Sequence, residues 1–202
     1  MKLKELEAQV EELKARLRTQ EDIEEIKKLQ RIYAFYLERW MAQEMVDLFS
    51  NGPDVSITFP DGTLLGKEGI KREFFESFDP TQDILHQMMM VSEVIDVDPD
   101  GKTAKGRWYG FGFHAIPQKK GILAKQATGI YENEYIKEDG KWKFKKLNFR
   151  YLVNCPFGKC WVDPVVLTTV QDREKIAKRD LPSTDPPGYR LPFHFKHPIT
   201  GK

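Results

Sequence analysis

Two tyrosines, Tyr33 and Tyr36, lie among apolar residues and carry hydroxyl groups that can take part in chemistry. In the segment 22–50 the apolar positions recur at spacings of three and four, which predicts a helix with one apolar face. These positions are Ile26, Leu29, Tyr33, Tyr36 or Leu37, and Trp40. A buried tyrosine hydroxyl needs a hydrogen-bond partner, so this face is either a core wall or the wall of a cavity. We favour the cavity, because later segments supply further polar groups.

Two histidines on predicted strands are the next candidates. His86 lies near the start of the stretch 84–97, and His114 lies near the end of the stretch 103–116. Imidazole changes its charge near neutral pH, which suits it to general acid–base catalysis. Strand alternation places Trp108 on the same face as His114, so both are pocket candidates. The residues alone leave open whether either histidine is catalytic.

Three glycines share that strand face. Gly106, Gly110 and Gly112 alternate with larger residues, which predicts that the sheet bends there or that another group comes close. In the stretch 141–153 the apolar phase shifts near Lys145, which predicts a bulge. A bent sheet wrapped around a helix would make a cone with a cavity inside.

The elements that must position these residues follow a simple order. Helices are predicted at about 22–49 and 66–78, with a short strand at 55–59 between them. Four long strands then follow, at 84–97, 103–116, 123–137 and 141–153. Turn sequences separate three of these stretches, so we expect an antiparallel meander and an α+β fold, with a cone-shaped curved sheet wrapped around the helices.

The two ends of the chain differ from the middle. Residues 1–20 are predicted to be an N-terminal helical arm, because Leu3, Leu6, Val10, Leu13 and Leu17 follow a short heptad pattern. A capping box at 19–22 predicts a break before the domain at 21–155. Residues 156–202 are a C-terminal extension, with a short helix at 164–178 and an extended, proline-rich tail. The arm is too short to be stable alone, so we expect a homo-oligomer, a dimer or trimer.

Composition limits the partners. The 202 residues include 32 basic and 31 acidic side chains, so the formal net charge is +1. This balance disfavours nucleic acid and anionic membranes and fits a hydrophobic small-molecule ligand. No apolar run is close to the length of about 20 residues that a membrane span needs. The N-terminus lacks the apolar core of a signal peptide. We therefore expect a cytoplasmic protein.

The sequence contains no pattern typical of a cofactor site. His194 and His197 lack carboxylate or thiolate neighbours for a metal, and there is no phosphate loop, nucleophile elbow or dinucleotide fingerprint. We therefore expect no metal and no cofactor. Cys155 and Cys160 are expected to be free thiols, with a redox or disulfide pair as the alternative.

Three strings make the chain resemble the SnoaL-like branch of the nuclear transport factor 2-like superfamily. They are Tyr33 with Glu38 and Leu48-Phe49, Gly66-Lys-Glu-Gly-Ile70, and Gly129-Ile-Tyr-Glu-Asn-Glu134 followed by Asp139-Gly-Lys-Trp-Lys143. The resemblance covers roughly residues 22–153. It implies a cone-shaped fold that hosts isomerases, dehydratases, cyclases, lyases and non-catalytic binders.

Within this branch the chain is most similar to bile-acid 7α-dehydratases, through its charged leader and the string Gly106-Arg-Trp-Tyr109. By position, this resemblance implies four catalytic residues: Tyr33, Glu38, His86 and Arg150. The chain departs from the pattern at Gly112 and Phe59, where those enzymes have an aspartate and a tyrosine. His114, on the same strand face as Gly112, could supply the missing polar group.

Residues and resemblance together predict a cofactor-independent lyase, preferably a dehydratase, or an isomerase acting on a hydrophobic cyclic or aromatic small molecule. His86 would be the general base, Glu38 would orient it, and Tyr33 would donate a hydrogen bond. The alternatives are a carbon–carbon lyase on an aromatic substrate and a non-catalytic binding or assembly module. The residues expected to bind substrate are Tyr36, Phe59, Trp108, Gly112, His114, Tyr131 and Asn148.

One conflict concerns Arg150. Strand alternation puts Asn148 and Arg150 on the face opposite Phe149. Either the bulge turns Arg150 inward, or the pair is solvated.

Overall fold

The computed structural model describes residues 3–77, 85–117, 121–157, 177–185 and 189–202. Three helices and seven strands occur in these ranges. They are α1 (Leu3–Glu38), α2 (Ala42–Asp47), β1 (Ser56–Phe59), β2 (Gly62–Leu65), α3 (Gly66–Glu76), β3 (Leu85–Val97), β4 (Thr103–Pro117), β5 (Ile122–Glu138), β6 (Lys141–Pro156) and β7 (Leu181–Pro182).

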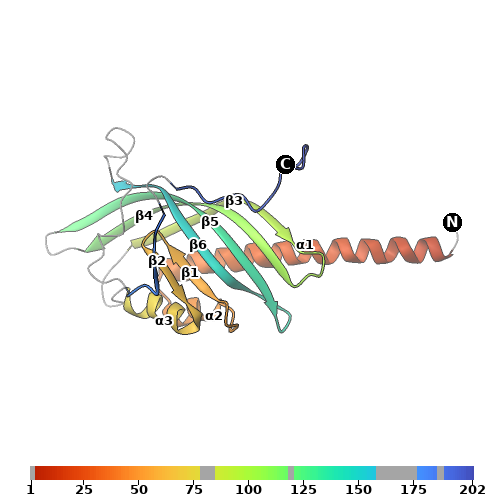
Figure 1. The fold of residues 1–202 in the computed structure, drawn as a ribbon, viewed down its shortest axis with the longest axis horizontal. Coiled ribbons are helices and arrows are strands. Elements are labelled where there is room, and N and C mark those ends of the chain that lie inside the picture. Colours follow the sequence, from red (N-terminus) through yellow and green to blue (C-terminus); the bar gives the residue numbers. More distant parts are fainter. Residues whose placement is uncertain (1–2, 78–84, 118–120, 158–176, 186–188) are drawn as a thin grey trace.

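The strands form one curved sheet in the order β3-β4-β5-β6-β1-β2-β7. The four long strands pair antiparallel with their neighbours, and β1 joins β6 in parallel. Figure 1 shows these strands arching over the C-terminal part of α1, with α2 and α3 on the same side. The predicted α+β meander is therefore confirmed.

Two irregularities curve the sheet where the sequence predicts them. The register between β5 and β6 shifts after the pair Glu134–Lys146, so that Lys145 is the extra residue of the expected bulge. At Gly112 a Cβ atom would lie 2.0 Å from the carbonyl oxygen of Gln87. The close approach predicted at Gly112 is therefore made by the backbone of β3, and a role for this glycine in binding substrate is not supported.

Helix α1 differs from its prediction at both ends. It runs unbroken from Leu3 to Glu38, so the predicted break at 19–22 is wrong. It also ends well before residue 49, because Trp40 adopts a left-handed conformation with φ of 48° and α2 starts two residues later. A bulky residue rarely adopts this φ, and the surrounding contacts must hold it there. The indole nitrogen of Trp40 donates a hydrogen bond to the carbonyl of Phe74 over 2.9 Å.

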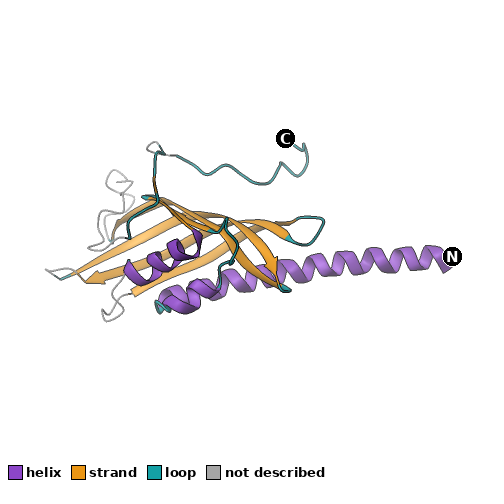
Figure 2. Cartoon of the chain, turned by 60° about the horizontal axis from the view of Figure 1, so that its bottom comes forward, coloured by secondary structure: helices purple, strands orange, loops and turns teal. Residues whose placement is uncertain are grey.

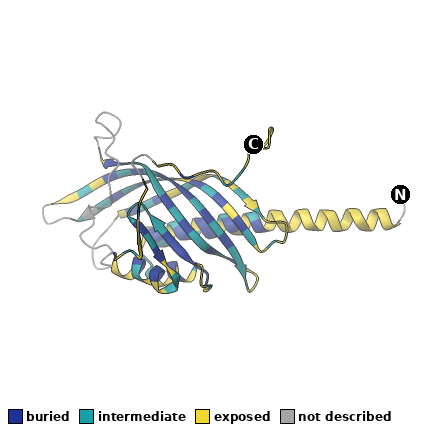
Figure 3. Ribbon diagram, viewed as in Figure 1, coloured by how far each residue is buried: buried dark blue, intermediate teal, exposed yellow. Residues whose placement is uncertain are grey.

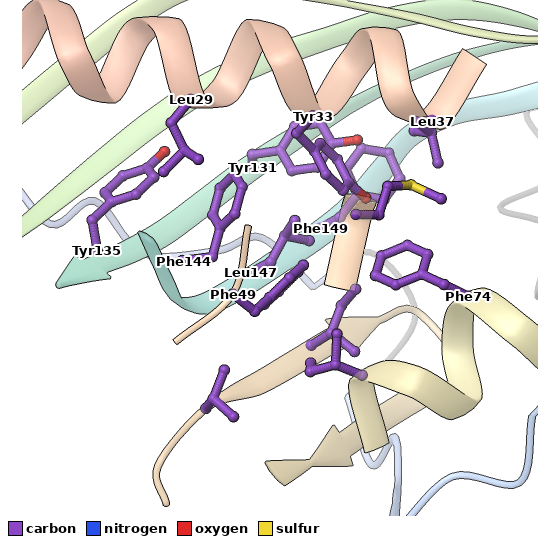
Figure 4. Packing of buried hydrophobic residues seen from close by; sticks show 14 of the residues in the cluster. Leu29, Tyr33, Leu37, Phe49, Phe74, Tyr131, Tyr135, Phe144, Leu147 and Phe149 are labelled. Atoms are coloured by element: carbon purple, nitrogen blue, oxygen red, sulfur yellow. The ribbon is translucent and has the colours of Figure 1, made fainter. Parts of the chain in front are cut away.

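The two halves of α1 have different surroundings. Its C-terminal half buries Ile26, Leu29, Tyr33 and Leu37 against the sheet, as Figure 4 shows for the last three. The N-terminal half projects beyond the sheet (Figure 2) and is exposed on every side (Figure 3). No helix among the described residues is long and apolar enough to cross a membrane.

The described part of the C-terminal extension lies against the chain's own sheet. Strand β7 pairs with β2, and Leu191 is buried. Arg107 on β4 donates a hydrogen bond to the carbonyl of Pro192 over 3.1 Å, and its guanidinium lies 4.5 Å from the centre of the Phe193 ring. These residues of the tail therefore pack on the sheet. Most of the helix predicted at 164–178 falls outside the described ranges.

The cysteine prediction is wrong at Cys155. This residue, at the end of β6, is disulfide-bonded. The sequence contains one other cysteine, Cys160, which lies outside the described residues.

Candidate functional site

A cavity lies between the end of α1, helix α3 and the curved sheet. Its walls are largely aromatic, with rings contributed by Tyr33, Trp40, Phe59, Phe74, Tyr131, Phe149 and Tyr151. The volume of this cavity is about 20 Å³. The cavity therefore has room for about one water as the side chains stand. A ring-containing ligand must displace side chains to enter it.

Two histidines meet at the wall of this cavity. His86 on β3 and His114 on β4 are directly opposite each other in the strand register, and their ring centres are 4.3 Å apart. Both are buried, with 7% and 6% of their surface exposed. His86 lines the cavity and stacks on the indole of Trp40, with 5.9 Å between ring centres. Two imidazoles so close would repel each other if both carried a charge.

Two tyrosines supply phenols to the same cavity. Tyr33 and Tyr131 are both buried, and Figure 4 shows them next to each other between α1 and the sheet. Burial raises the pKa of Tyr131 well above its usual value, and the nearby phenols of Tyr33 and Tyr151 raise it further. The Tyr131 phenol therefore stays protonated at neutral pH. Within the described part of the chain no hydrogen bond to its hydroxyl is recorded, so it is available as a donor to a ligand.

A charged cluster forms another side of the cavity. Arg179, from the C-terminal extension, pairs with Glu73 on α3 through Nη1 and with Asp61 through Nε, the latter over 2.7 Å. The Glu73 side chain is 1% exposed and also accepts a hydrogen bond from Ser77 over 3.1 Å. Burial acts to lower the pKa of Arg179, but the two carboxylates outweigh burial, so this pKa is raised and the guanidinium stays charged.

The structure brings together five of the predicted site residues. Tyr33, His86, Phe59 and Tyr131 line the cavity, and His114 lies behind His86.

Glu38, the acid predicted to orient His86, lies away from the cavity. Glu38 is the last residue of α1, is exposed, and does not line the cavity. Five residues along an ideal helix turn the chain by about 140° relative to Tyr33, which directs Glu38 away from the core. The prediction that Glu38 pairs with His86 is therefore wrong. Among the described residues, the rings of His114 and Trp40 pack against His86.

Arg150 also lies outside the cavity. Its guanidinium pairs with Asp185 over 2.6 Å on the opposite face of β6 from Phe149, so the bulge does not turn it inward. Its predicted role inside the cavity is therefore wrong.

Three predicted binding residues have other roles. Trp108 donates a hydrogen bond to the hydroxyl of Tyr135 over 3.0 Å, away from the cavity. Asn148 does not line the cavity, and its backbone nitrogen donates to the side chain of Asn133 over 3.1 Å. Tyr36 packs at the edge of the core and is not part of the cavity wall.

The charged cluster of Arg179, Glu73 and Asp61 was not predicted from the sequence. Glu73 could have been found, because it lies between Ile70 and Phe74 on the apolar face of a predicted helix, where an acid needs a partner. Asp61 precedes Gly62, a pair typical of turns, so its residue type does not by itself indicate a site. No local signal marks Arg179, because its approach to the cavity depends on long-range folding. No group of side chains suited to hold a metal ion occurs in the ranges that the structure describes.

The fold and the cavity define a class of protein, the α+β cone of the nuclear transport factor 2-like superfamily, in which a curved sheet and helices enclose a pocket. A family model for the SnoaL-like domain matches residues 18–148. The chain therefore belongs to the SnoaL-like family. No protein with a curated description matches the sequence.

Solved structures with the same fold share little sequence with this chain. A candidate scytalone dehydratase from Novosphingobium aromaticivorans is 18% identical with a TM-score of 0.58, over 69% of this chain and 90% of that one. LinA is 16% identical with a TM-score of 0.57, over 74% and 99%. A protein of unknown function from Mycobacterium tuberculosis is 18% identical with a TM-score of 0.54, over 67% and 74%. At these identities the likeness establishes the fold alone.

Proposed function

We propose that the protein is a cofactor-independent lyase, a dehydratase acting on a hydrophobic cyclic alcohol, with His86 as the general base. The observation that carries this proposal is the His86–His114 pair at the wall of an aromatic cavity that also contains the phenol of Tyr131. In this proposal His114 takes the role predicted for Glu38, as the neighbour that positions His86. The likeness to a candidate scytalone dehydratase is consistent with this class of reaction.

The reaction requires only proton transfers. His86 takes a proton from a carbon next to a carbonyl group, and the electron pair of the broken C–H bond forms a C=C bond. The C–O bond at the neighbouring carbon breaks, and the hydroxyl leaves as water with the proton returned by the imidazolium. Tyr33 and Tyr131 donate hydrogen bonds to the oxygen on which negative charge develops. The aromatic walls favour a ring as the body of the substrate.

A panel of cyclic 3-hydroxy ketones tests the proposal, because loss of water produces a conjugated ketone that absorbs in the ultraviolet. We expect turnover by the wild-type protein and a loss of about 100-fold or more in His86→Ala, the usual size of a general-base contribution. His197→Ala is the matched control, since His197 is exposed in the tail. A protein that binds the panel and converts none of it is a binding module, and the catalytic proposal fails.

A carbon–carbon lyase is the second candidate, since the same base and phenols serve it. It is supported by the aromatic lining of the cavity. Cleavage of an aromatic hydroxy ketone into an aldehyde and a ketone, without loss of water, would favour it over dehydration.

We also propose that the N-terminal half of α1 binds a second copy of this chain. Leu3, Leu13 and Leu17 are each more than half exposed, and a helix of this length is marginal when unsupported. The apolar stripe follows a heptad, and in an antiparallel pair Glu7 of one helix lies beside Lys14 of the other on both sides of the stripe. Burial of the stripe in a dimer removes the exposed leucines from water.

A further inference from the structure

Two buried polar atoms of the cavity's charged cluster lack a hydrogen-bond partner among the residues that the structure describes. They are Nη2 of Arg179 and Oδ1 of Asp61. The Arg179 side chain is 6% exposed, and both residues line the cavity. An unpaired buried polar group is unfavourable, and such groups in native proteins usually serve a ligand or an ordered water.

The two unpaired atoms belong to one ion pair. In a guanidinium group, Nη2 and Nε present their hydrogens on the same edge, and here Nε donates to Oδ2 of Asp61 over 2.7 Å. The remaining donor and the remaining acceptor therefore lie beside the same Arg179–Asp61 contact. Nη1 is used by Glu73, which fixes the orientation of the guanidinium plane.

The charge of the cluster selects the kind of group that fits. One guanidinium and two carboxylates sum to a net charge of minus one, so an anionic ligand is repelled. A neutral hydroxyl satisfies both atoms at once, because its oxygen accepts from Nη2 and its hydrogen is donated to Oδ1. An ether oxygen accepts but cannot donate, so it satisfies only the arginine.

We propose that Arg179 and Asp61 bind a hydroxyl group of an uncharged ligand in the cavity, and so determine specificity for alcohols over ethers and carboxylates. This rests on the proposed function only in treating the cavity as the place where substrate binds. Arg179 reaches the cavity from the C-terminal extension, outside residues 18–148 that match the SnoaL-like domain. Of the two proposed hydroxyl-binding residues, Asp61 therefore lies inside the matched domain and Arg179 outside it.

Three ligands with one ring test the proposal: benzyl alcohol, benzyl methyl ether and benzoate, titrated into the full-length protein and followed by calorimetry. We expect benzyl alcohol to bind at least about tenfold more tightly than either of the others, the usual effect of leaving a buried donor or acceptor unpaired. Arg179→Met and Asp61→Asn should each reduce this preference to below about threefold. Equal affinities for alcohol and ether in the wild-type protein, or no saturable binding of the alcohol, would overturn the proposal.

Two further variants separate binding from folding. Arg179→Met leaves Glu73 buried without its cation, so the double variant Glu73→Gln/Arg179→Met is measured beside it, and a preference for the alcohol retained in a folded double variant would overturn the proposal. Arg150→Met is the matched control, because Arg150 also pairs with an acid of the C-terminal extension but lies outside the cavity. We expect Arg150→Met to keep the preference.

The outcome is independent of turnover. His86→Ala removes the proposed base, yet it should keep the preference for benzyl alcohol, because His86 is not a partner of the Arg179–Asp61 contact. If the wild-type protein converts none of the hydroxy ketones but keeps its preference for benzyl alcohol, the catalytic role is refuted and hydroxyl recognition stays in place. Turnover without the preference refutes hydroxyl recognition alone.

Discussion

Tyr131 and Tyr135 lie four residues apart on the same face of β5, and both phenols are buried under α1 (Figure 4). The Tyr135 hydroxyl donates to Gln30 over 2.8 Å and accepts from Trp108 over 3.0 Å and Asn133 over 3.3 Å. The Tyr131 hydroxyl faces the cavity, and the described residues offer it no recorded hydrogen bond. The same residue type on the same strand thus has a hydroxyl bonded to neighbouring side chains at one position and a hydroxyl that faces a cavity at the other.

This difference shows that a buried polar group is not by itself evidence of a functional site. At Tyr135 the hydroxyl has one acceptor and two donors among its neighbours, and Tyr135 does not line the aromatic cavity. Such a network specifies a packing arrangement. The Tyr131 region combines polar groups with empty space, and it is there that we place ligand binding.

Of the changes that test the difference between Tyr131 and Tyr135, Tyr131→Phe should have the largest effect, and this effect is on kcat. Removal of the phenol deletes a hydrogen-bond donor to the developing charge, which should lower kcat by about 100-fold for the cyclic hydroxy ketones. The unfolding free energy should change by less than about 0.5 kcal/mol, because no recorded partner loses a bond. Steady-state kinetics and urea unfolding measure the two effects. A large loss of stability with unchanged kcat would contradict the assignment.

Tyr135→Phe should show the opposite pattern. It leaves Gln30, Trp108 and Asn133 without their shared partner, so we expect a loss of about 1–3 kcal/mol in the free energy of unfolding. Turnover at a temperature where the variant is folded should stay within about twofold of wild type. A loss of kcat comparable to that of Tyr131→Phe would place this cluster in the site as well.

The exposed half of α1 offers a test of assembly. Replacing Leu6 and Leu13 by Lys should convert the proposed dimer to a monomer in light scattering, because two charges would enter its apolar stripe. Replacing Ala8 and Ala15 by Lys is the matched control, since these residues lie on the other side of the helix from the stripe. A mass that is the same for both double variants would rule out the stripe as the interface.

The smallest expected effect is on stability at alkaline pH. Burial raises the pKa of both Tyr131 and Tyr135 above the usual value of a tyrosine, about 10. In the folded state these phenols hold protons that the unfolded chain loses above about pH 10, so the unfolding free energy should fall as pH rises beyond that value. Tyr131→Phe should reduce the slope. Urea unfolding from pH 8 to 11 measures it, and identical slopes for variant and wild type would contradict the raised pKa of Tyr131.

The fold was largely predictable because its signals are local. Alternation and turn sequences identify the four long strands, and the change of apolar phase at Lys145 identifies the bulge. The end of α1 at Glu38 was not predictable, because the apolar spacing continues to Trp40. The unusual φ of Trp40 results from its contacts with Phe74 and His86, which are distant in the sequence.

The site was predicted in part. His86 and Tyr33 were identified through the resemblance, and His114 was placed near the site by strand alternation, which register then pairs with His86. Trp108 was predicted to bind substrate because it shares that strand face, but it lies outside the cavity. Strand alternation predicts the face of a residue, and not how far along the strand the cavity extends. Arg179 acts through contacts with residues more than 100 positions earlier in the chain, and no local pattern encodes such contacts.

The most direct test of the central claim is a crystal structure of the protein with benzyl alcohol. We predict that the ring lies in the aromatic cavity near Tyr131 and Phe149, with its oxygen within about 3.2 Å of Nη2 of Arg179. We also predict that the hydrogen bonds of Tyr135 remain as they are. A ligand bound elsewhere, or one that enters the core by displacing Gln30 from Tyr135, would contradict the account.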